Sequence, residues 1–401
     1  MPFCDTVCLY CGCNKIITAI KKRAAPYLEL LERELALRAA QFDTARPVQQ
    51  LHWGGGTPTF ISDAEMLQLM TATRRHFRLL EDDSGDYSVE IHPGRLGEER
   101  LGVLREIGFN RLSMGVQDFN PEVQKAVNRF NSVEEVAALC RRARTEGFHS
   151  LSMDLIYGLP LQSLASVAAT LEQVIELGPD RLSLFNYAHM PHLFKTQRRI
   201  ASDTLPAPQV KLAILQHAIE RLQAAGYVYI GMDHFARPDD SLARAQAQGL
   251  MQRNFQGYTT HRDCDLLAFG LSSISAIDNI YMQNHKDMIR YAQSLEPGRE
   301  PACRGLTLNG DDLLRRAVIN QLICHFSLDF TDIEQRFGIH FESYFASALH
   351  ALRPMAEDGL VQLRPNGMDV TPAGRLLVRR LCMLFDAYLE AAPGQRYSRI
   401  V

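Results

Sequence analysis

The sequence has no apolar run close to the length of a membrane span, which takes roughly 18 consecutive apolar residues. It begins without the charged and apolar stretches of a secretory signal. It also has little net charge, because 43 Lys and Arg stand against 46 Asp and Glu for a formal charge of -3. This balance gives no reason to expect nucleic acid or an anionic membrane as a partner. These absences predict a cytoplasmic protein that binds neither.

Cysteine is scarce, with nine residues in 401, and four of the nine lie within the first 13 positions. The other five are scattered, mostly beside apolar stretches where a free cysteine acts as a small buried side chain. They are Cys140, Cys264, Cys303, Cys324 and Cys382. In a reducing cytoplasm the N-terminal group is more typical of a metal site or of catalysis than of disulfides.

The chain, 46% hydrophobic, is long enough for one large domain and a smaller one. From residue 25 to about 285, short β-branched and aromatic runs alternate with amphipathic segments, which is typical of βα units around a parallel sheet. The strand candidates are residues 48–53, 86–91, 109–114, 149–157, 180–187 and 226–232, and helical patterns occupy 27–42, 63–78, 133–146, 164–177 and 208–225. This α/β pattern favours an open or complete (β/α) barrel over a doubly wound sheet, although spacing does not separate the two.

Beyond about residue 300 the pattern changes to helices without buried strands between them. Asn366 and Gly367 then stand between two short alternating runs, which is a hairpin signal. Three helices, a hairpin and a last helix suggest a winged-helix-like module, but no basic stripe with base-reading residues stands out. We therefore expect a (β/α) barrel domain over residues 1–300 and a smaller, mostly helical domain over residues 301–401.

The N-terminal cysteines have a spacing that suits a metal cluster. Cys4, Cys8 and Cys11 read C-x3-C-x2-C, and Cys13 follows. Three thiolates on a short loop can hold three irons of a [4Fe–4S] cluster and leave the fourth iron open. Zinc is the main alternative and unligated cysteines are a lesser one. Structural zinc sites usually use two separated ligand pairs, and no second C-x2-C or H-x3-5-H pair follows, so the spacing favours the cluster.

The stretch CDTVCLYC, with Tyr10 before the third cysteine, resembles the motif of the radical S-adenosylmethionine superfamily. Further on, HWGGGTPTF, GFNRLSMGVQDFN, MDLIYGLP, FNYAH and GMDHFARPDD resemble the oxygen-independent coproporphyrinogen III dehydrogenases of haem biosynthesis. The resemblance runs from residue 2 to the C-terminus. It implies a partial (β/α) barrel, a [4Fe–4S] cluster on Cys4, Cys8 and Cys11, and S-adenosylmethionine chelated at the open iron. It places Cys13 outside the cluster.

The same resemblance identifies cofactor contacts on motifs whose residue types alone are weak signals. The glycines at 54–56 are compatible with a tight turn or a ligand, and polar groups at strand ends cap loops as often as they bind. Two S-adenosylmethionine molecules are implied, one on the cluster and one nearby. The expected contacts are Tyr10, Gly55, Gly56, Thr57, Glu90 and Ile274, and, for the second molecule, Gln117, Arg129, Asp154 and Ala188. Glu90 is also the expected catalytic residue.

Some features leave questions open. In GMDHFARPDD, His234 and Arg237 either hold a structural loop or contact the substrate, whose four carboxylates require cationic partners. The family normally carries several dozen residues ahead of the cysteines, so we expect this chain to be truncated or to be a shortened homologue. His92 stands where the family often has an acidic residue.

The resemblance implies an enzyme that converts coproporphyrinogen III to protoporphyrinogen IX without oxygen. A 5′-deoxyadenosyl radical would take hydrogen from a propionate β-carbon, and loss of carbon dioxide and an electron would leave a vinyl group, twice per substrate. An unidentified electron donor, an unidentified electron acceptor and a monomeric state are also implied. The alternatives are a haem-binding or haem-delivery protein on the same scaffold, against which Cys13 and GMDHFARPDD argue, and an inactive truncated form.

Overall fold

The computed structural model describes residues 1–262 and 264–389, which form two compact units. The first unit comprises Met1–Ala225, Cys264–Ile277 and Tyr281–Gly305, and the second comprises mainly residues 226–262 and 306–389. Because the chain passes between the units several times, a single boundary near residue 300 stays a prediction. Among the described residues, no helix combines the length and the apolarity that crossing a membrane requires.

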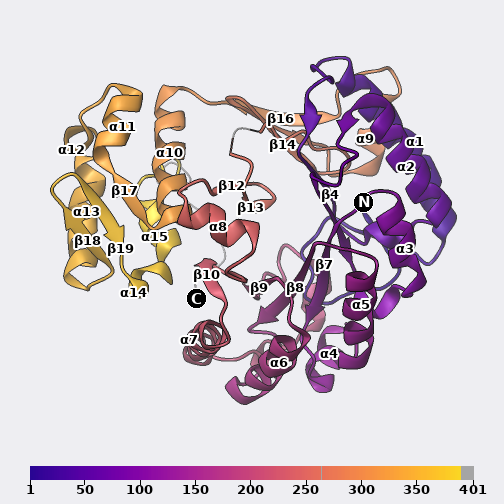
Figure 1. Ribbon diagram of the computed structural model, residues 1–401, viewed down its shortest axis with the longest axis horizontal. Helices are drawn as coiled ribbons and strands as arrows, with labels where there is room; N and C mark the ends of the chain where they lie inside the picture. The colour runs from indigo at the N-terminus through magenta and orange to yellow at the C-terminus, as the bar shows by residue number, and fades with distance from the viewer. Residues whose placement is uncertain (263, 390–401) are drawn as a thin grey trace. The chain divides into compact units, whose positions relative to one another are not determined.

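The first unit is built on five parallel strands that neighbour one another in chain order. They are β4 (Gln50–Trp53), β6 (Asp86–Ile91), β7 (Arg111–Gln117), β8 (Ser150–Tyr157) and β9 (Arg181–Asn186). The helices of this unit are α1 (Ala25–Ala39), α2 (Asp63–His76), α3 (Glu99–Glu106), α4 (Pro121–Val127), α5 (Val133–Thr145), α6 (Leu164–Leu177) and α7 (Pro208–Ala224). Figure 1 shows α1–α6 along the outer side of the strands, and the βα pattern expected from the sequence is confirmed.

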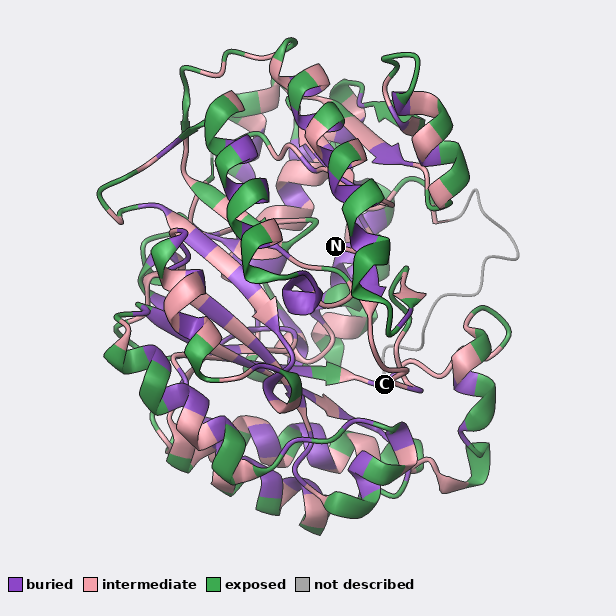
Figure 2. Ribbon diagram, turned by 90° about the vertical axis from the view of Figure 1, so that its right-hand side faces the viewer, coloured by how far each residue is buried: buried purple, intermediate pink, exposed green. Residues whose placement is uncertain are grey.

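Side chains alternate between the two faces of this sheet. In β7, Leu112, Met114 and Val116 are buried, and the residues between them are half-buried. Figure 2 shows the same alternation along the strands. Neighbouring strands keep register, with Glu90 beside Ser113, so the polar residues of adjacent strands share one face. Because parallel sheets are usually apolar on both faces, this polar face indicates a ligand site.

Short elements complete the first unit. They are β1 (Phe3–Cys4), β2 (Ile16–Ile17), β3 (Pro47–Val48), β5 (Arg78–Leu79), β14 (Ile274–Ile277), β15 (Ile280–Asn284), α9 (Met288–Leu295), β16 (Ala302–Thr307) and the 3-10 turns η1 (Lys21–Ala24), η2 (Pro58–Phe60), η3 (Pro93–Arg95), η4 (Lys195–Arg199) and η5 (Ser202–Thr204). A buried polar network joins α1 to α9 and β15. The Glu34 carboxylate accepts from Arg38 Nε (3.2 Å), Tyr291 Oη (2.5 Å) and Asn284 Nδ2 (2.7 Å), so the late segment is fixed to the first helix.

The second unit has the winged-helix-like order expected, with one strand added. Its elements are β10 (Val228–Gly231), β11 (His234–Ala236), α8 (Ser241–Ala247), β12 (Gln252–Asn254), β13 (Gly257–Thr259), α10 (Gly310–His325), β17 (Ser327–Asp329), α11 (Phe330–Phe337), α12 (Phe341–Tyr344), α13 (Ala346–Glu357), β18 (Val361–Arg364), β19 (Gly367–Val370), α14 (Pro372–Arg375) and α15 (Val378–Met383). The hairpin at Gly367 is present, and β17 pairs with β19. The last helix expected is divided into α14 and α15.

Candidate active site

The cysteine segment forms a loop whose two ends are held together. β1 pairs in parallel with β2, with Cys4 opposite Ile17. Phe3 is 2% exposed, and its ring packs against those of Tyr27 and Phe60 with centroid distances of 5.6 and 5.4 Å. The start of the loop is therefore anchored in the core of the first unit.

The middle of the loop is anchored as well. The Leu9 N–H donates to the Val127 carbonyl oxygen (2.9 Å), and Asn128 Nδ2 donates to the Val7 carbonyl oxygen (2.7 Å). Leu9 itself is buried in a small apolar cluster with Val127. The thiols therefore project from a loop that is anchored by the buried side chain of Leu9 and by these two hydrogen bonds.

Hydrogen-bond donors point at two of the three predicted ligands. Thr57 Oγ1 donates to Cys4 Sγ (3.6 Å), and Arg129 Nη1 donates to Cys8 Sγ (3.7 Å). Burial raises the pKa of the Cys4 thiol, and the bond from Thr57 works against this rise. All three thiols are free and half-buried. They are accessible to a metal group and surrounded by donors that stabilise thiolates.

Of the three predicted ligands, Cys11 is the one whose pKa is lowered. The pKa of Cys11 is lowered to about 6, chiefly by the hydrogen bond from the Cys13 thiol. The Cys13 N–H, whose nitrogen lies 3.4 Å from the Cys11 sulfur, and the Lys15 ammonium lower it further. The bond between the two thiols raises the pKa of Cys13. Lys15 Nζ also donates to the Cys11 carbonyl oxygen (2.7 Å). The loop thus presents Cys11 as a thiolate and Cys13 as a hydrogen-bond donor.

The glycines after β4 bring the chain against the cysteine segment. The Gly56 N–H donates to the Met1 carbonyl oxygen (2.7 Å), and the Thr57 N–H donates to the Phe3 carbonyl oxygen (2.8 Å). A Cβ at Gly55, which has φ of +112°, would lie 2.8 Å from the Met1 oxygen, and a Cβ at Gly56 would lie 2.7 Å from the Phe3 oxygen. Only glycine permits this approach. Contact of Gly55, Gly56 and Thr57 with a cofactor stays a prediction.

Glu90, near the end of β6, faces the same turn. Its Oε1 lies 3.2 Å from His52 Nε2, and its Oε2 accepts from the Gly55 N–H (3.1 Å). Burial works against the charged form, but the bonds from His52 and Gly55 hold the pKa of Glu90 below its usual value. The side chain is 41% exposed. Glu90 is therefore a charged carboxylate that a ligand can reach.

Gln117 and Arg129 meet over Gly115. Gln117 has φ of +71° and follows a register irregularity in β7. A Cβ at Gly115 would lie 2.7 Å from both Arg129 Nη2 and Gln117 Nε2, and Arg129 Nη2 donates to the Gly115 carbonyl oxygen. Arg129 is 9% exposed, and its Nε–H has no acceptor among the described residues. Gly115 was not predicted from the sequence, although a glycine inside a strand often marks such a close approach.

Asp154 lies on the same polar face, beside Gly115 in the register. Ser113 Oγ donates to Asp154 Oδ2 (3.0 Å). Burial, followed by the negative charge of Glu90, raises the pKa of Asp154 to about 6, against the hydrogen bonds from Ser183 and Ser113. The polar face therefore holds one carboxylate whose pKa is lowered and one whose pKa is raised to about 6.

Gln197, in η4, joins two of the predicted residues and was missed by the sequence analysis. Its Nε2 donates to the Tyr10 carbonyl oxygen (2.8 Å) and to the Ala188 carbonyl oxygen (3.2 Å). Its Oε1 accepts from the Met190 N–H (2.6 Å), and the residue is 2% exposed. A glutamine that bonds to backbone groups leaves no recognisable motif, so the sequence offered no signal for it.

Ile274 begins β14, is half-buried, and takes no part in the hydrogen bonds that join the other predicted residues. The cysteine loop does reach the later part of the first unit, because Asn14 Nδ2 donates to the Lys286 carbonyl oxygen (3.0 Å). The structure thus brings the other predicted residues together around the cysteine loop and the polar face, while a cofactor role for Ile274 rests on the resemblance.

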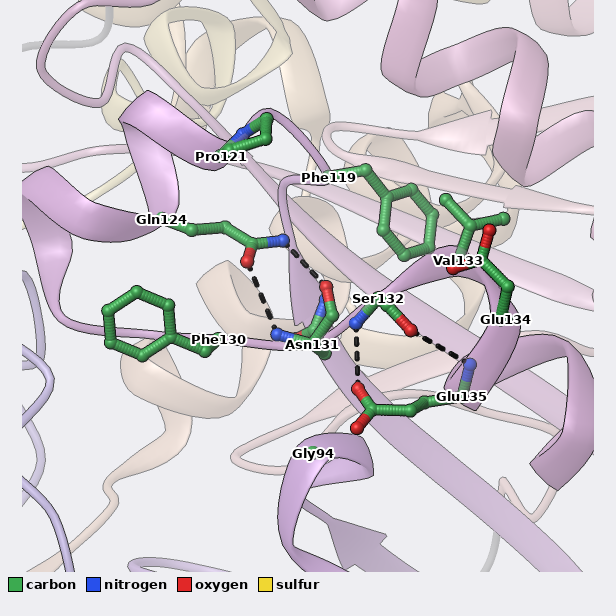
Figure 3. Close-up of a pocket in the computed structure, with 10 residues that line it drawn as sticks. All are labelled: Gly94, Phe119, Pro121, Gln124, Phe130, Asn131, Ser132, Val133, Glu134 and Glu135. Atoms are coloured by element: carbon green, nitrogen blue, oxygen red, sulfur yellow. Dashed lines mark hydrogen bonds between the residues drawn. The ribbon is translucent and has the colours of Figure 1, made fainter.

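A pocket of about 410 Å³ lies against the loop that follows α4 (Figure 3). Its lining residues are Gly94, Phe119, Pro121, Gln124, Phe130, Asn131, Ser132, Val133, Glu134 and Glu135. Gln124 Nε2 donates to the Asn131 carbonyl oxygen (2.7 Å), which braces the loop. None of the predicted site residues lines this pocket, so it is separate from the cysteine site.

The donors around the cysteines suit the thiolates of a [4Fe–4S] cluster. Among the described residues, no group of three or more His, Cys, Asp or Glu side chains is arranged to hold one metal ion. In a [4Fe–4S] cluster each cysteine binds a different iron, so the sulfurs need not converge on one point. The buried Arg129 Nε–H without an acceptor suits an anionic carboxylate such as that of S-adenosylmethionine. The residues present therefore fit both groups.

Comparisons with known proteins show the family of the chain. The chain matches the Radical SAM superfamily over residues 1–174 and the HemN C-terminal domain over residues 308–377. A relative from Pseudomonas aeruginosa, named oxygen-independent coproporphyrinogen III oxidase, is 54% identical over 100% of this chain and 87% of its own length. A protein of the same name from Escherichia coli K12 is 50% identical with the same coverage.

A solved structure, described as coproporphyrinogen III oxidase (HemN) from Escherichia coli, a Radical SAM enzyme, gives a TM-score of 0.94 at 51% identity. The match covers 97% of this chain and 89% of that chain. The fold class and the family expected from the motifs are confirmed. The chain belongs to the oxygen-independent coproporphyrinogen III oxidases.

Proposed function

We propose that this chain catalyses the oxygen-independent oxidative decarboxylation of coproporphyrinogen III. Each of two propionate side chains loses a hydrogen atom, carbon dioxide and one electron and becomes a vinyl group, which gives protoporphyrinogen IX. The observation that carries the proposal is the anchored loop with three free thiols beside a polar sheet face, in a chain related over its full length to enzymes of this name.

Cys4, Cys8 and Cys11 are the proposed iron ligands. When bound, a [4Fe–4S] cluster and S-adenosylmethionine supply one-electron reduction and the radical that takes hydrogen from the propionate. The chain prepares one of these thiols for iron, since Cys13 and Lys15 both favour the charged form of Cys11. Reduced, free thiols of this kind support a cytoplasmic location.

The polar face positions the cofactor in this proposal. Arg129 receives an anionic carboxylate, and Gln117 beside it offers an amide to hydroxyl or amino groups. Glu90 presents a charged carboxylate to the cofactor on the cluster. Asp154, whose pKa is raised to about 6, accepts from a ribose hydroxyl. A second cofactor molecule near Gln117, Arg129, Asp154 and Ala188 is part of the proposal.

The remaining roles follow from the chemistry. For each vinyl group formed, the cluster would take up one electron to cleave the cofactor and the substrate radical would give up another as carbon dioxide leaves, so an electron donor and an electron acceptor are proposed as partners. Tyr10, Gly55, Gly56, Thr57 and Ile274 are proposed as further cofactor contacts, and we propose that the chain acts as a monomer.

The test is anaerobic iron–sulfur reconstitution of the chain. We expect about four irons per chain and a spin-resonance spectrum of the reduced cluster that changes when S-adenosylmethionine is added. With coproporphyrinogen III, S-adenosylmethionine, a reductant for the cluster and an electron acceptor, the reconstituted protein is expected to release two molecules of carbon dioxide per protoporphyrinogen formed. Cofactor cleavage without release of carbon dioxide would refute the proposed substrate.

A matched pair of variants tests the ligand set. Cys8→Ser is expected to lose the cluster because it removes one thiolate. Cys303→Ser, at another accessible cysteine of the chain, is expected to retain the iron. Equal iron content in the two variants would contradict the assignment of Cys8.

A further inference from the structure

Two exposed basic segments adjoin the cysteine loop of the first unit. Residues 6–28, which begin inside the loop and run through η1 into α1, hold four basic residues and no acidic one. Residues 191–202, which include η4, hold three Lys and Arg residues and again no acidic one. The exposed cations of the two segments, together named the basic surface, are Lys21, Lys22, Arg23, Lys195, Arg198 and Arg199. Because the whole chain has slightly more acidic than basic residues, this excess of positive charge is local.

Both segments are fixed against the cysteine loop. In the first segment, β2 pairs with β1 and places Ile17 opposite Cys4. In the second segment, Gln197 donates to a carbonyl oxygen of the loop (2.8 Å). A Cβ at Gly12 would lie 2.9 Å from Phe194 Cζ, so the loop and this segment are in close contact. The basic surface therefore borders the loop that carries the predicted iron ligands.

The cations of the basic surface lack the carboxylate partners that other arginines of this unit have. Arg100 pairs with Asp63 (2.7 Å), and Arg111 pairs with Asp86 (2.6 Å). Within the part of the chain that the structure describes, no carboxylate forms an ion pair with any cation of the basic surface. Exposed cations whose charge is not balanced inside the molecule attract an anionic partner from solution.

Apolar side chains are exposed beside these charges. Ile20, just before η1, is 61% exposed, and Leu193, just before η4, is 59% exposed. Charges around a protein interface steer the partner to the surface, and apolar side chains in the interface contact it. The combination of exposed apolar side chains with cations and no acidic residue is therefore suited to docking an acidic protein.

We propose that the basic surface is the docking site of the electron donor, a small acidic protein with a low-potential one-electron centre. This inference rests on the proposed function, in which a cluster on the cysteine loop takes up one electron for each cofactor cleaved. The donor loses that electron and is oxidised, with no bond formed or broken. Because electron transfer slows steeply with distance, the donor has to dock beside the loop, which is where the basic surface lies. Nucleic acids and anionic membranes also match the charge, but neither supplies an electron.

The experiment measures docking directly. The probe is a plant-type [2Fe–2S] ferredoxin with an acidic surface, and its affinity for the anaerobically reconstituted holoenzyme is measured by calorimetry at low and at physiological salt. We expect binding to weaken as the salt concentration rises, because exposed charge pairs are screened. The double variant Arg23→Gln with Arg199→Gln takes one cation from each segment. It is expected to bind about fourfold more weakly, because each exposed charge pair contributes about twofold to the affinity.

Two matched variants separate docking from net charge and from loss of fold. Arg75→Gln with Arg141→Gln also removes two exposed arginines, in the carboxyl-terminal halves of α2 and α5, and is expected to bind like the wild type. Arg23→Lys with Arg199→Lys keeps both charges and is expected to bind like the wild type as well. Equal weakening in the α2 and α5 variant would assign the effect to net charge, and weak binding of the lysine variant would assign it to packing. Either result would overturn the proposal.

The rate of cluster reduction gives a second readout. Reduction by reduced ferredoxin is expected to slow about fourfold in Arg23→Gln with Arg199→Gln, because the lost charges steer the encounter. Reduction by photoreduced deazariboflavin, which is small and uncharged, is expected to stay unchanged. Wild-type affinity for ferredoxin in this variant would refute the docking site. Binding of the wild type to phosphatidylserine vesicles but not to ferredoxin would refute it too, because the surface would then belong to a membrane.

Failure of the proposed function is distinguishable from failure of this inference. A wild type that binds ferredoxin and accepts its electron but releases no carbon dioxide would refute the proposed function and leave the docking site in place. A wild type that releases carbon dioxide with deazariboflavin as reductant but does not bind ferredoxin would do the reverse.

Discussion

The raised pKa of Asp154 makes a quantitative prediction about stability. The carboxyl has a pKa of about 6 in the folded chain because of burial and the charge of Glu90, against about 3.9 in an unfolded chain. The folded state therefore binds this proton more tightly than the unfolded state does. The stabilising contribution is fully present below pH 3.9 and is lost as the pH rises through about 6.

The magnitude follows from the shift. About two pKa units correspond to about 3 kcal/mol, of which about 2 kcal/mol is lost between pH 4.5 and pH 7.0. Asp154→Asn removes the titration and retains an oxygen that can accept from Ser113. Relative to the wild type, the free energy of unfolding of Asp154→Asn is expected to rise by about 2 kcal/mol from pH 4.5 to pH 7.0.

The assay is urea unfolding of the iron-free chain at the two pH values. The single tryptophan, Trp53, is 8% exposed in β4, so its fluorescence reports the unfolding of the first unit. Glu134→Gln, at an exposed position, controls for the loss of a negative charge without burial. A difference between wild type and Asp154→Asn that is the same at both pH values would refute the reasoning.

Three further predictions concern residues that lie around the candidate site or stabilise the first unit. Arg38→Met leaves the Glu34 carboxylate buried without its cation and is expected to destabilise the first unit by about 3 to 5 kcal/mol in urea unfolding, whereas a change under 1 kcal/mol would contradict a structural role. Gly56→Ala places a Cβ 2.7 Å from the Phe3 oxygen, so we expect it to lower both the unfolding temperature and the iron content, and full iron loading would show that the loop can move aside. Cys13→Ser is expected to retain about four irons by colorimetric assay, and a loss of iron like that of a ligand variant would make Cys13 a ligand.

The polar face of the sheet was predictable from the strands alone. The runs at 86–91 and 149–157 were recognisable, and β6 and β8 lie within one residue of them. Side chains alternate between the two faces along each strand, so parallel strands in register place Glu90 and Asp154 on one face. This prediction does not depend on the structure of the loops. The cysteine spacing likewise marked one short segment, and the structure anchors this segment as a loop, whereas its role in binding a metal stays a prediction.

The residues and short elements that hold the site in place were not predictable from the strand pattern. Gln197 bonds to carbonyl oxygens of residues far away in the chain, and such bonds depend on the whole fold and leave no pattern in the sequence. The strand β17 is only three residues long and shows no clear alternation. The last helix was expected to be continuous, but Gly374 packs so tightly that a Cβ would lie 1.9 Å from the Leu360 oxygen, and the helix is interrupted just after it.

His92, which stands where the family often has an acidic residue, affects the electrostatics of the site. Burial, with the charges of Arg129 and Arg95, lowers the pKa of His92 to about 3, so its ring is neutral. It is 6% exposed and its Nδ1 has no partner among the described residues. An acidic residue at this position would stand near Arg129 and offset its charge, and the neutral ring does not. Residue 92 therefore leaves the charge of Arg129 for the anion that the proposed function places beside it, the carboxylate of the cofactor.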